Sequence, residues 1–332
     1  NEGKFIVTLS FKEGLKIWDR EGHLKGSFTS GKWFHNIAVS RDSKRIALIN
    51  DKKIEILDTA GKSIMSLEGM DANANAVTFS PDGNHIAAAG WGKNIMIWKK
   101  DGTLLNKIDI TNHAGHDISF TRDGSALICT INGFPCKGVR ILKTNGEEIN
   151  SFKIGSEDDR HYPVNSALSH DGSRVALTSN DRRISIWDWK KGRRLNQMEG
   201  LEHVPLKVFF SGDDKMVYAC MGAGMQIRRW KPESGVSDNL IAAAGEWIHY
   251  TPDGYWDGSP SSGKLVAMSR GLEAFGIDQF ALKNNRSDLI LESMGLGTKE
   301  LIEHYYQQYL KRLRKSGMSE SDLSGDLHVP EA

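Results

Sequence analysis

The sequence of 332 residues has no excess of either charge, since 43 Lys and Arg face 42 Asp and Glu for a formal net charge of +1. Dedicated nucleic-acid binders show a basic excess, so we expect no nucleic-acid partner. No apolar run reaches membrane-spanning length and no signal-peptide core opens the sequence, so we expect no membrane partner. The three cysteines have no repeated spacing, which argues against a disulfide framework and favours a reducing, cytoplasmic location.

A short turn recurs about every 41 residues, and its Asn or Asp serves as the anchor of each copy. The anchors are Asn1, Asp42, Asp82, Asp123, Asp171, Asp213 and Asp253. A period of this length with several strands per unit indicates a propeller. The 34 glycines fit a chain with many tight turns.

Each anchor lies between two apolar runs of strand length, as Asn36–Val39 and Arg45–Ile49 illustrate. A third run ends in a bulky residue such as Trp98, and a fourth, more polar run has the character of an edge strand. Four antiparallel strands per unit predict an all-β, seven-bladed β-propeller over residues 1–276. The first blade lacks its inner strand because Asn1 already lies in the turn, so either preceding residues are missing or another segment closes the ring. We expect an irregular seventh blade.

Two strands end in the pair Trp-Asp, at Trp18-Asp19 and Trp187-Asp188. With the period and the turn, these pairs resemble the WD repeat, and the resemblance covers Asn1–Gly276. The sequence departs from that pattern where Trp or Asp is replaced, at Leu57, Lys99, Leu142 and Lys231. The Gly-His pair before the inner strand occurs in that place only at Gly115-His116. The resemblance therefore implies a WD-type propeller with an incomplete Asp-His-Ser-Trp network.

Beyond Asp278 the apolar period changes from two to 3.6, which predicts helices. A short helix is expected over Ser287–Met294. Thr298 is expected to cap a longer one that ends near Gly317, with basic residues in its last turns. We therefore assign 277–332 to a helical tail that links to a downstream domain.

The tail contains a series of short blocks in order: Tyr250–Asp257, Asp278–Phe280, Asn285–Asp288, Tyr309–Leu313 and His328–Glu331. Over Glu246–Ala332 they resemble the junction segment of bacterial proteins that join WD repeats to a C-terminal caspase-like cysteine peptidase. The resemblance implies a protease domain after residue 332 as an intramolecular partner. The catalytic His and Cys of that family have no counterpart here, so we expect no enzyme activity from residues 1–332.

Cys129 and Cys220 each fall six residues after a turn Asp, where other blades have Leu or Ala, so they are expected to pack in the core. Cys136 lies in a longer loop, and a nucleophile there would need an adjacent base. Histidines 113, 116, 161 and 170 could suggest zinc, but a zinc site needs convergent ligands and we expect none. No cofactor is expected either.

Loop aromatics are the better candidates for function, because exposed Trp, Tyr and Arg are common interface anchors. Trp33, Trp91 and Tyr162 are expected to open on one face of the propeller, although packing between blades is the alternative. Arg182 belongs to a basic cluster in one blade, for which a solvated surface is the alternative.

The first hypothesis is a non-catalytic propeller that binds a protein or peptide as the sensor of a caspase-like protease. The second is a propeller enzyme with its active site in the central channel, which needs convergent titratable groups. The third is a free-standing scaffold for a protein complex.

Overall fold

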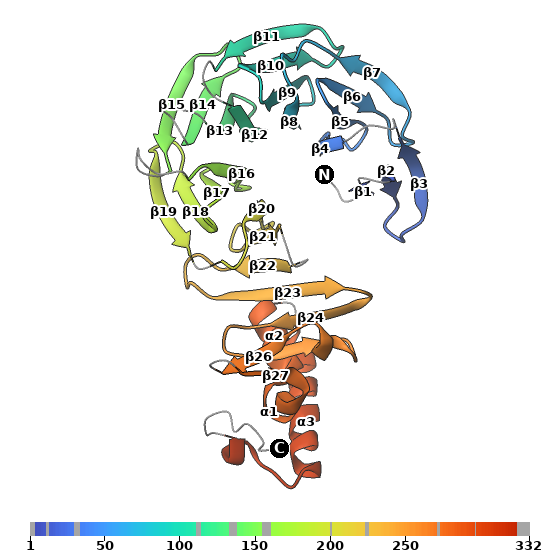
Figure 1. Cartoon of the computed structure of the whole chain (residues 1–332), viewed down its shortest axis with the longest axis vertical. Helices are drawn as coiled ribbons and strands as arrows, with labels where there is room; N and C mark the ends of the chain where they lie inside the picture. Colours follow the sequence, from blue (N-terminus) through green and yellow to red (C-terminus); the bar gives the residue numbers. More distant parts are fainter. Residues whose placement is uncertain are drawn as a thin grey trace. The chain divides into compact units, whose positions relative to one another are not determined.

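The structure is a computed structural model that describes residues 4–10, 13–29, 34–110, 114–132, 138–154, 161–199, 201–222, 226–270, 273–295 and 297–323. Six β-sheets follow one another along the sequence as blades, and a hairpin and helices come after them (Figure 1). The all-β propeller with a short helical C-terminal part is therefore confirmed, with six blades and not seven.

Blade 1 contains β1 (Ile6–Ser10), β2 (Gly14–Trp18) and β3 (Leu24–Phe28). Blade 2 contains β4 (Phe34–Val39), β5 (Ile46–Asn50), β6 (Lys53–Leu57) and β7 (Ser63–Leu67). Blade 3 contains β8 (Ala74–Phe79), β9 (His85–Gly90), β10 (Asn94–Lys99) and β11 (Leu104–Asp109). Blade 4 contains β12 (Ala114–Phe120), β13 (Ala126–Asn132), β14 (Gly138–Lys143) and β15 (Glu148–Lys153). Blade 5 contains β16 (Pro163–Leu168), β17 (Arg174–Ser179), β18 (Arg183–Asp188) and β19 (Arg193–Met198). Blade 6 begins with β20 (Pro205–Phe210), β21 (Val217–Met221), β22 (Gln226–Trp230) and β23 (Ser237–Ala243).

The recurring turn joins the first two strands of a blade through a fixed set of hydrogen bonds. In blade 3, Ser80 Oγ donates to Asp82 Oδ1 at 2.5 Å, and the N–H of Asn84 donates to the same oxygen at 3.0 Å. These bonds stabilise the charged carboxylate, and they lower the pKa of Asp82 to about 2. A Ser or Thr two residues before the anchor repeats this contact in four other blades, at Ser40, Thr121, Ser169 and Ser211.

In blades 2, 3 and 4, successive residues of the second strand pack alternately into two different hydrophobic cores. In β5, Ile46 and Leu48 pack with residues of blade 1, whereas Ala47 and Ile49 pack with residues of blade 3. All four are completely buried. A strand buried on both faces explains why these runs are continuously apolar in the sequence.

A polar side chain at the start of an inner strand bonds blades 2, 3 and 4 each to the blade that follows, and these residues are spaced by about one repeat. Asn36 Nδ2 donates to the carbonyl of Asn75 at 3.1 Å, and Asn75 Nδ2 donates to the carbonyl of Gly115 at 3.0 Å. Asp117 Oδ2 accepts from the N–H and the hydroxyl of Ser166. Burial raises the pKa of Asp117, which is opposite in sign to the turn aspartates.

Among the described residues, blade 1 has three strands where blades 2 to 5 have four, and the missing inner strand of blade 1 stays a prediction. Ile6 of β1 is 54% exposed, whereas the corresponding Ile46 of β5 and Ile86 of β9 are fully buried. The predicted turn at Asn1 lies outside the described residues.

The prediction of a seventh blade is wrong. Its first run forms β24 (Glu246–Tyr250), which pairs with β23, and β25 (Trp256–Gly258) pairs with β24, so both extend the sixth sheet to six strands. The reason is the two-residue turn Ala244-Gly245, which has φ values of +53° and +82°. Two positive φ angles make a tight hairpin, which returns the chain onto β23 and does not start a new sheet.

The remaining strands are the hairpin β26 (Ala267–Arg270) and β27 (Glu273–Gly276), and the helices follow: α1 (Ala281–Asn284), α2 (Ser287–Met294) and α3 (Lys299–Lys315). Thr298 caps α3 by accepting from the N–H of Leu301, as predicted. Within the described residues, no helix combines the length and apolar character needed to cross a membrane.

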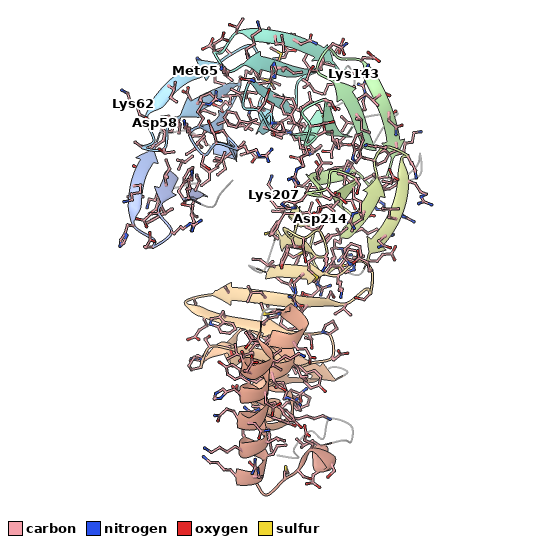
Figure 2. The ribbon with its side chains drawn as sticks, turned by 180° about the vertical axis from the view of Figure 1, so that it is seen from behind. Asp58, Lys62, Met65, Lys143, Lys207 and Asp214 are labelled. Carbon is pink, nitrogen blue, oxygen red and sulfur yellow. The ribbon has the colours of Figure 1, made fainter. Side chains whose placement is uncertain are left out.

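By contacts, the chain divides into two compact units, Asn1–Val217 and Tyr218–Ala332. The first contains blades 1 to 5 with β20, arranged along an arc. Figure 2 shows Asp58 and Lys62 at the outer rim of this arc, and Lys207 on its inner side. The domain boundary at residue 276 stays a prediction.

Candidate partner-binding surface

Trp91 lies directly after β9 and is 60% exposed, the most exposed large hydrophobic side chain among the described residues. Its backbone is nevertheless fixed, because its N–H donates to the carbonyl of Asn73 at 3.0 Å. An exposed indole on a fixed backbone suits a contact residue, since little order must be gained on binding.

His116 lies in β12 at an irregularity of the pairing with β13, where the register steps from Gly115 to Asp117. Its ring meets the Trp91 ring edge-on, with centroids 5.5 Å apart and an interplanar angle of 69°. It also stacks on the Tyr162 ring at 5.1 Å and 28°. Burial lowers the pKa of His116, so the imidazole is neutral at pH 7.

Tyr162 precedes β16 and is held by a pair of bonds to the loop between β17 and β18. Its N–H donates to Asn180 Oδ1 at 2.8 Å, and its carbonyl accepts from the N–H of Asn180 at 3.1 Å. We call Trp91, His116 and Tyr162 the three-ring surface. It joins blades 3, 4 and 5, so two of the predicted partner-binding residues contact the same histidine.

Arg182 is exposed in the same loop as Asn180 and has a φ of +64°. Its guanidinium lies 3.5 Å from the carbonyl of Glu202, and no ring contact joins it to the three-ring surface among the described residues. Trp33 lies outside the described residues. The partner-binding role of these residues stays a prediction.

Sequence reasoning missed His116 as part of this surface. Gly115-His116 was interpreted as the Gly-His pair of a structural hydrogen-bond network, but the bond to the next blade comes from the adjacent Asp117. The only indication in the sequence was that His116 lies at the start of an inner strand. Residue types do not show which side chain faces outward where the strand pairing is irregular.

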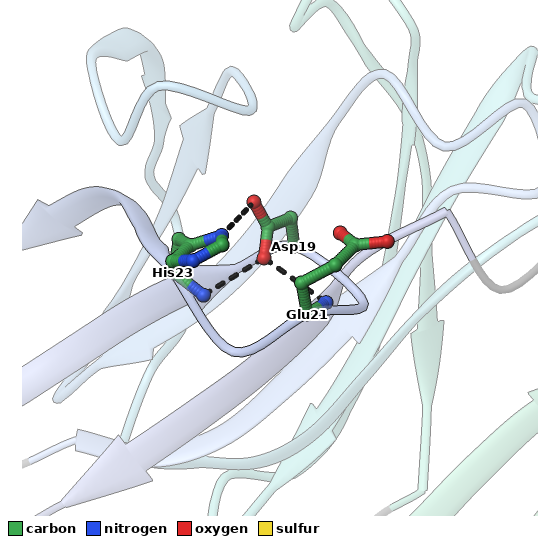
Figure 3. Close-up of side chains that lie close together, drawn as sticks. All are labelled: Asp19, Glu21 and His23. Atoms are coloured by element: carbon green, nitrogen blue, oxygen red, sulfur yellow. Dashed lines mark hydrogen bonds and ion pairs between the residues drawn. The ribbon is translucent and has the colours of Figure 1, made fainter.

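One group of possible metal ligands lies close together among the described residues: Asp19, Glu21 and His23, in the turn between β2 and β3 (Figure 3). Asp19 Oδ1 accepts from the N–H groups of Glu21 and His23, and Asp19 Oδ2 lies 3.1 Å from His23 Nδ1. These local bonds, that to the His23 N–H foremost, lower the pKa of Asp19. The group is explained as a hydrogen-bonded turn, as at Asp58, and does not require an ion.

The other candidate groups have structural surroundings. Cys129 is completely buried, and burial raises the pKa of its thiol to about 12, which suits packing and not nucleophilic attack. Cys220 is half-buried. His170 Nδ1 lies 3.0 Å from Asp214 Oδ1, and His161 Nδ1 lies 3.4 Å from Asp181 Oδ2. Cys136 and His113 lie outside the described residues.

Parts of the expected Asp-His-Ser-Trp network occur in separate blades. Trp18 Nε1 donates to Thr8 Oγ1 at 2.8 Å in blade 1, and Ser179 Oγ donates to Asp181 in blade 5. In blade 5, however, Trp187 Nε1 donates to Ser185 on its own strand. Among the described residues, close polar contacts connect Ser179, Asp181 and His161 in blade 5, and Trp187 bonds to Ser185.

A second cluster lies within the unit Tyr218–Ala332 and is centred on Arg286. Its guanidinium pairs with Asp288 at 2.6 Å and lies 4.0 Å from the Tyr309 ring centroid. It also lies 5.8 Å from the Tyr306 ring and 6.0 Å from the Tyr255 ring. We call these residues the Arg286 cluster. Three of the sequence blocks singled out in the tail therefore meet at one point, while His328–Glu331 lies outside the described residues.

Comparison with known proteins supports the fold. Residues 61–99 match the family model described as "WD domain, G-beta repeat". Pre-mRNA-processing factor 17 of Saccharomyces cerevisiae is 21% identical over 248 residues, which cover 65% of this chain and 51% of that protein. WD repeat-containing protein 55 of Pongo abelii is 24% identical over 195 residues, covering 56% and 46%. An uncharacterized WD repeat-containing protein of Synechocystis is 29% identical over 98 residues, covering 29% and 28%.

The chain thus spans about half the length, or less, of these curated relatives. Their names are those of a pre-mRNA-processing factor and two WD repeat-containing proteins, and none of the three names refers to a caspase-like peptidase. The sheets, the repeated turn and the matched repeat together identify the fold as a WD-type β-propeller with six blades and a short helical C-terminal part.

Proposed function

We propose that this chain is a non-catalytic, protein-binding propeller that recognises its partner through the three-ring surface. The single observation behind this proposal is the contact of Trp91 and Tyr162 with one histidine across three blades. Aromatic residues of this kind are enriched at interface hot spots because they bury large areas at small entropic cost.

An aromatic photo-crosslinking side chain at position 91, which keeps a ring in the place of the indole, tests this proposal in the full-length protein expressed in the cells from which it comes. Trp247 provides a matched control, because it is 42% exposed on β24 and takes no part in the three-ring surface. A discrete protein crosslinked from position 91 and not from position 247 is the expected result. Identical products from both positions, or none from position 91, would contradict the proposal.

The finer part of the proposal is that the propeller is the sensor or regulatory region of a bacterial caspase-like protease. Its support is the order of the tail blocks, together with their convergence in the Arg286 cluster. A packed cluster that joins α2, α3 and the loop residue Tyr255 before β25 is a means by which the propeller could position a domain that follows the tail.

The regulatory part is tested in the longer protein by Arg286→Ala and by deletion of α3. Partner-dependent control of peptidase activity should be lost in both variants, while crosslinking from position 91 persists. Unchanged regulation in both would rule out a coupling role. A reading frame without a peptidase domain would remove the protease part of the proposal and leave partner binding untouched.

A second candidate function is a scaffold for a multiprotein complex, and it is favoured by the similarity to a relative named as a pre-mRNA-processing factor. The two candidates differ in what the crosslinked partner does. A scaffold remains in a stable, stoichiometric complex with several proteins, whereas a sensor binds one signal and alters one effector.

A further inference from the structure

We propose that the three-ring surface binds a proline-rich segment in the polyproline II conformation. This inference rests on the proposed function and specifies the chemistry of the partner. It is carried by the length of the surface, by its free hydrogen-bond donors and by its rigidity.

The length of the surface fits one turn of such a segment. The two ring-to-ring steps of 5.5 and 5.1 Å limit the distance between the Trp91 and Tyr162 centroids to about 11 Å. Polyproline II rises about 3.1 Å per residue and has three residues per turn, so prolines three apart are separated by about 9 Å. This spacing lies below that limit, and no direct ring contact joins Trp91 to Tyr162 among the described residues, so we place one proline at each outer ring with His116 between them.

The hydrogen-bonding groups are complementary as well. Within the described part of the chain, neither the Trp91 indole N–H nor the Tyr162 hydroxyl donates a hydrogen bond to another residue. Proline offers a carbonyl acceptor and no N–H donor, and the carbonyls of a polyproline II segment have no internal partners. A surface of ring faces with unused donors thus matches a ligand of apolar rings with unused acceptors.

Both sides of this contact are ordered before they meet. The backbones of Trp91 and Tyr162 are bonded to Asn73 and Asn180, and polyproline II is a conformation that such segments adopt when free. An acidic segment is a weaker fit, because the arginines of the nearby loop are not all available. Arg183 already lies 3.1 Å from Asp181, and Arg182 lies beside the Glu202 carbonyl.

The test uses fluorescence anisotropy with three labelled dodecapeptides and the full chain. The first peptide is Pro-Leu-Ala repeated four times. The second has the same composition with no two prolines three apart, and the third replaces proline with glutamate. We expect the first to bind at least tenfold more tightly than the other two.

Variants locate the binding. Trp91→Ala and Tyr162→Ala should each weaken binding of the first peptide at least tenfold, Tyr162→Phe should weaken it two- to fivefold, and Trp247→Ala should have no effect. A shift of the Trp91 indole N–H resonance in the unmodified protein gives the same information without a substitution. Absence of binding at 1 mM, equal binding of the first two peptides, preference for the acidic peptide, or equal loss in Trp247→Ala would overturn the proposal.

Failure here is distinguishable from failure of the proposed function. If position 91 crosslinks a discrete partner whose contacting segment has no proline, partner binding stands and the polyproline II inference is wrong. If position 91 crosslinks nothing, both are wrong.

Discussion

The two compact units differ in where their most prominent charged contacts lie. In the unit Asn1–Val217, the repeated carboxylates lie in exposed turns and accept bonds from residues two positions away, as Asp82 does from Ser80 and Asn84. In the unit Tyr218–Ala332, Arg229 and Asp238 are 5% and 2% exposed and pair across neighbouring strands. His249 adds a 2.7 Å bond to the same carboxylate.

The difference shows where the stability of each unit comes from. The blades repeat a local contact many times, so each copy contributes little and the loss of one is tolerable. The second unit relies on single charged clusters that have no copy elsewhere among the described residues. Substitutions should therefore have small effects in the repeated turns of the unit Asn1–Val217 and large effects around Arg229 and Arg286 in the unit Tyr218–Ala332.

The largest expected effect is that of Asp238→Asn. It leaves the buried guanidinium of Arg229 without a counter-charge, which costs about 3–5 kcal/mol when one partner of a buried pair is removed. Hydrogen exchange of β22 to β24 should accelerate accordingly, while that of blades 2 to 5 stays unchanged. Asp213→Asn is the control in an exposed turn. Equal losses of stability in the two variants would contradict the difference between the units.

Arg286→Met should destabilise the second unit by about 2–3 kcal/mol, because it leaves the buried Asp288 unpaired and removes the cation from the tyrosine rings. Arg286→Lys keeps the charge and should recover part of the loss. The measurement is urea unfolding followed by hydrogen exchange of α2 and α3. Protection of both helices unchanged in Arg286→Met would show that the cluster is incidental.

Thr298→Ala should cost about 1 kcal/mol by removing the cap of α3, and Thr298→Ser should cost a few tenths because its hydroxyl can replace the threonine oxygen. The exchange rates of the first-turn amides, Leu301 among them, report this directly. A loss in the serine variant as large as in the alanine variant would mean that the threonine methyl, and not the cap, matters.

Substitutions of the turn aspartates should change the unfolding free energy least at neutral pH. Their effect should show in how the unfolding free energy depends on pH in acid. The pKa values of Asp82, Asp123 and Asp171 are lowered from 3.8 to about 2, chiefly by the hydroxyl bonds of Ser80, Thr121 and Ser169. A folded-state pKa below the unfolded value gives stability that is present above about pH 4 and lost as the pH falls towards 2. Replacing all three with Asn should flatten the decline of the unfolding free energy of the blades in this range, and an unchanged slope would contradict the assignment.

The same contrast explains what could be predicted from the sequence. The turns, the strands around them and the cap of α3 depend on neighbours within a few residues. The turn at Asp123 and the cap at Thr298 were therefore predicted correctly. The three strands that the structure describes in blade 1 follow the phase of the repeat. The count of blades failed at Ala244-Gly245, because a non-glycine residue with positive φ gives little warning of a hairpin.

The candidate site could be predicted only in part for the same reason. Exposed loop aromatics suggested Trp91 and Tyr162, but their meeting depends on His116, which is 25 residues from one and 46 from the other in the sequence. The Arg286 cluster likewise joins residues from three separate segments. Contacts of this range arise from the assembled sheets and helices and leave no local pattern.

The central claim is that recognition depends on the three-ring surface, and the most direct measurement is the affinity of the crosslinked partner for two single-residue variants. The account predicts that Trp91→Ala weakens binding at least tenfold without changing the melting temperature, whereas Trp247→Ala leaves the affinity unchanged. Equal affinities of the unmodified protein and Trp91→Ala would contradict it.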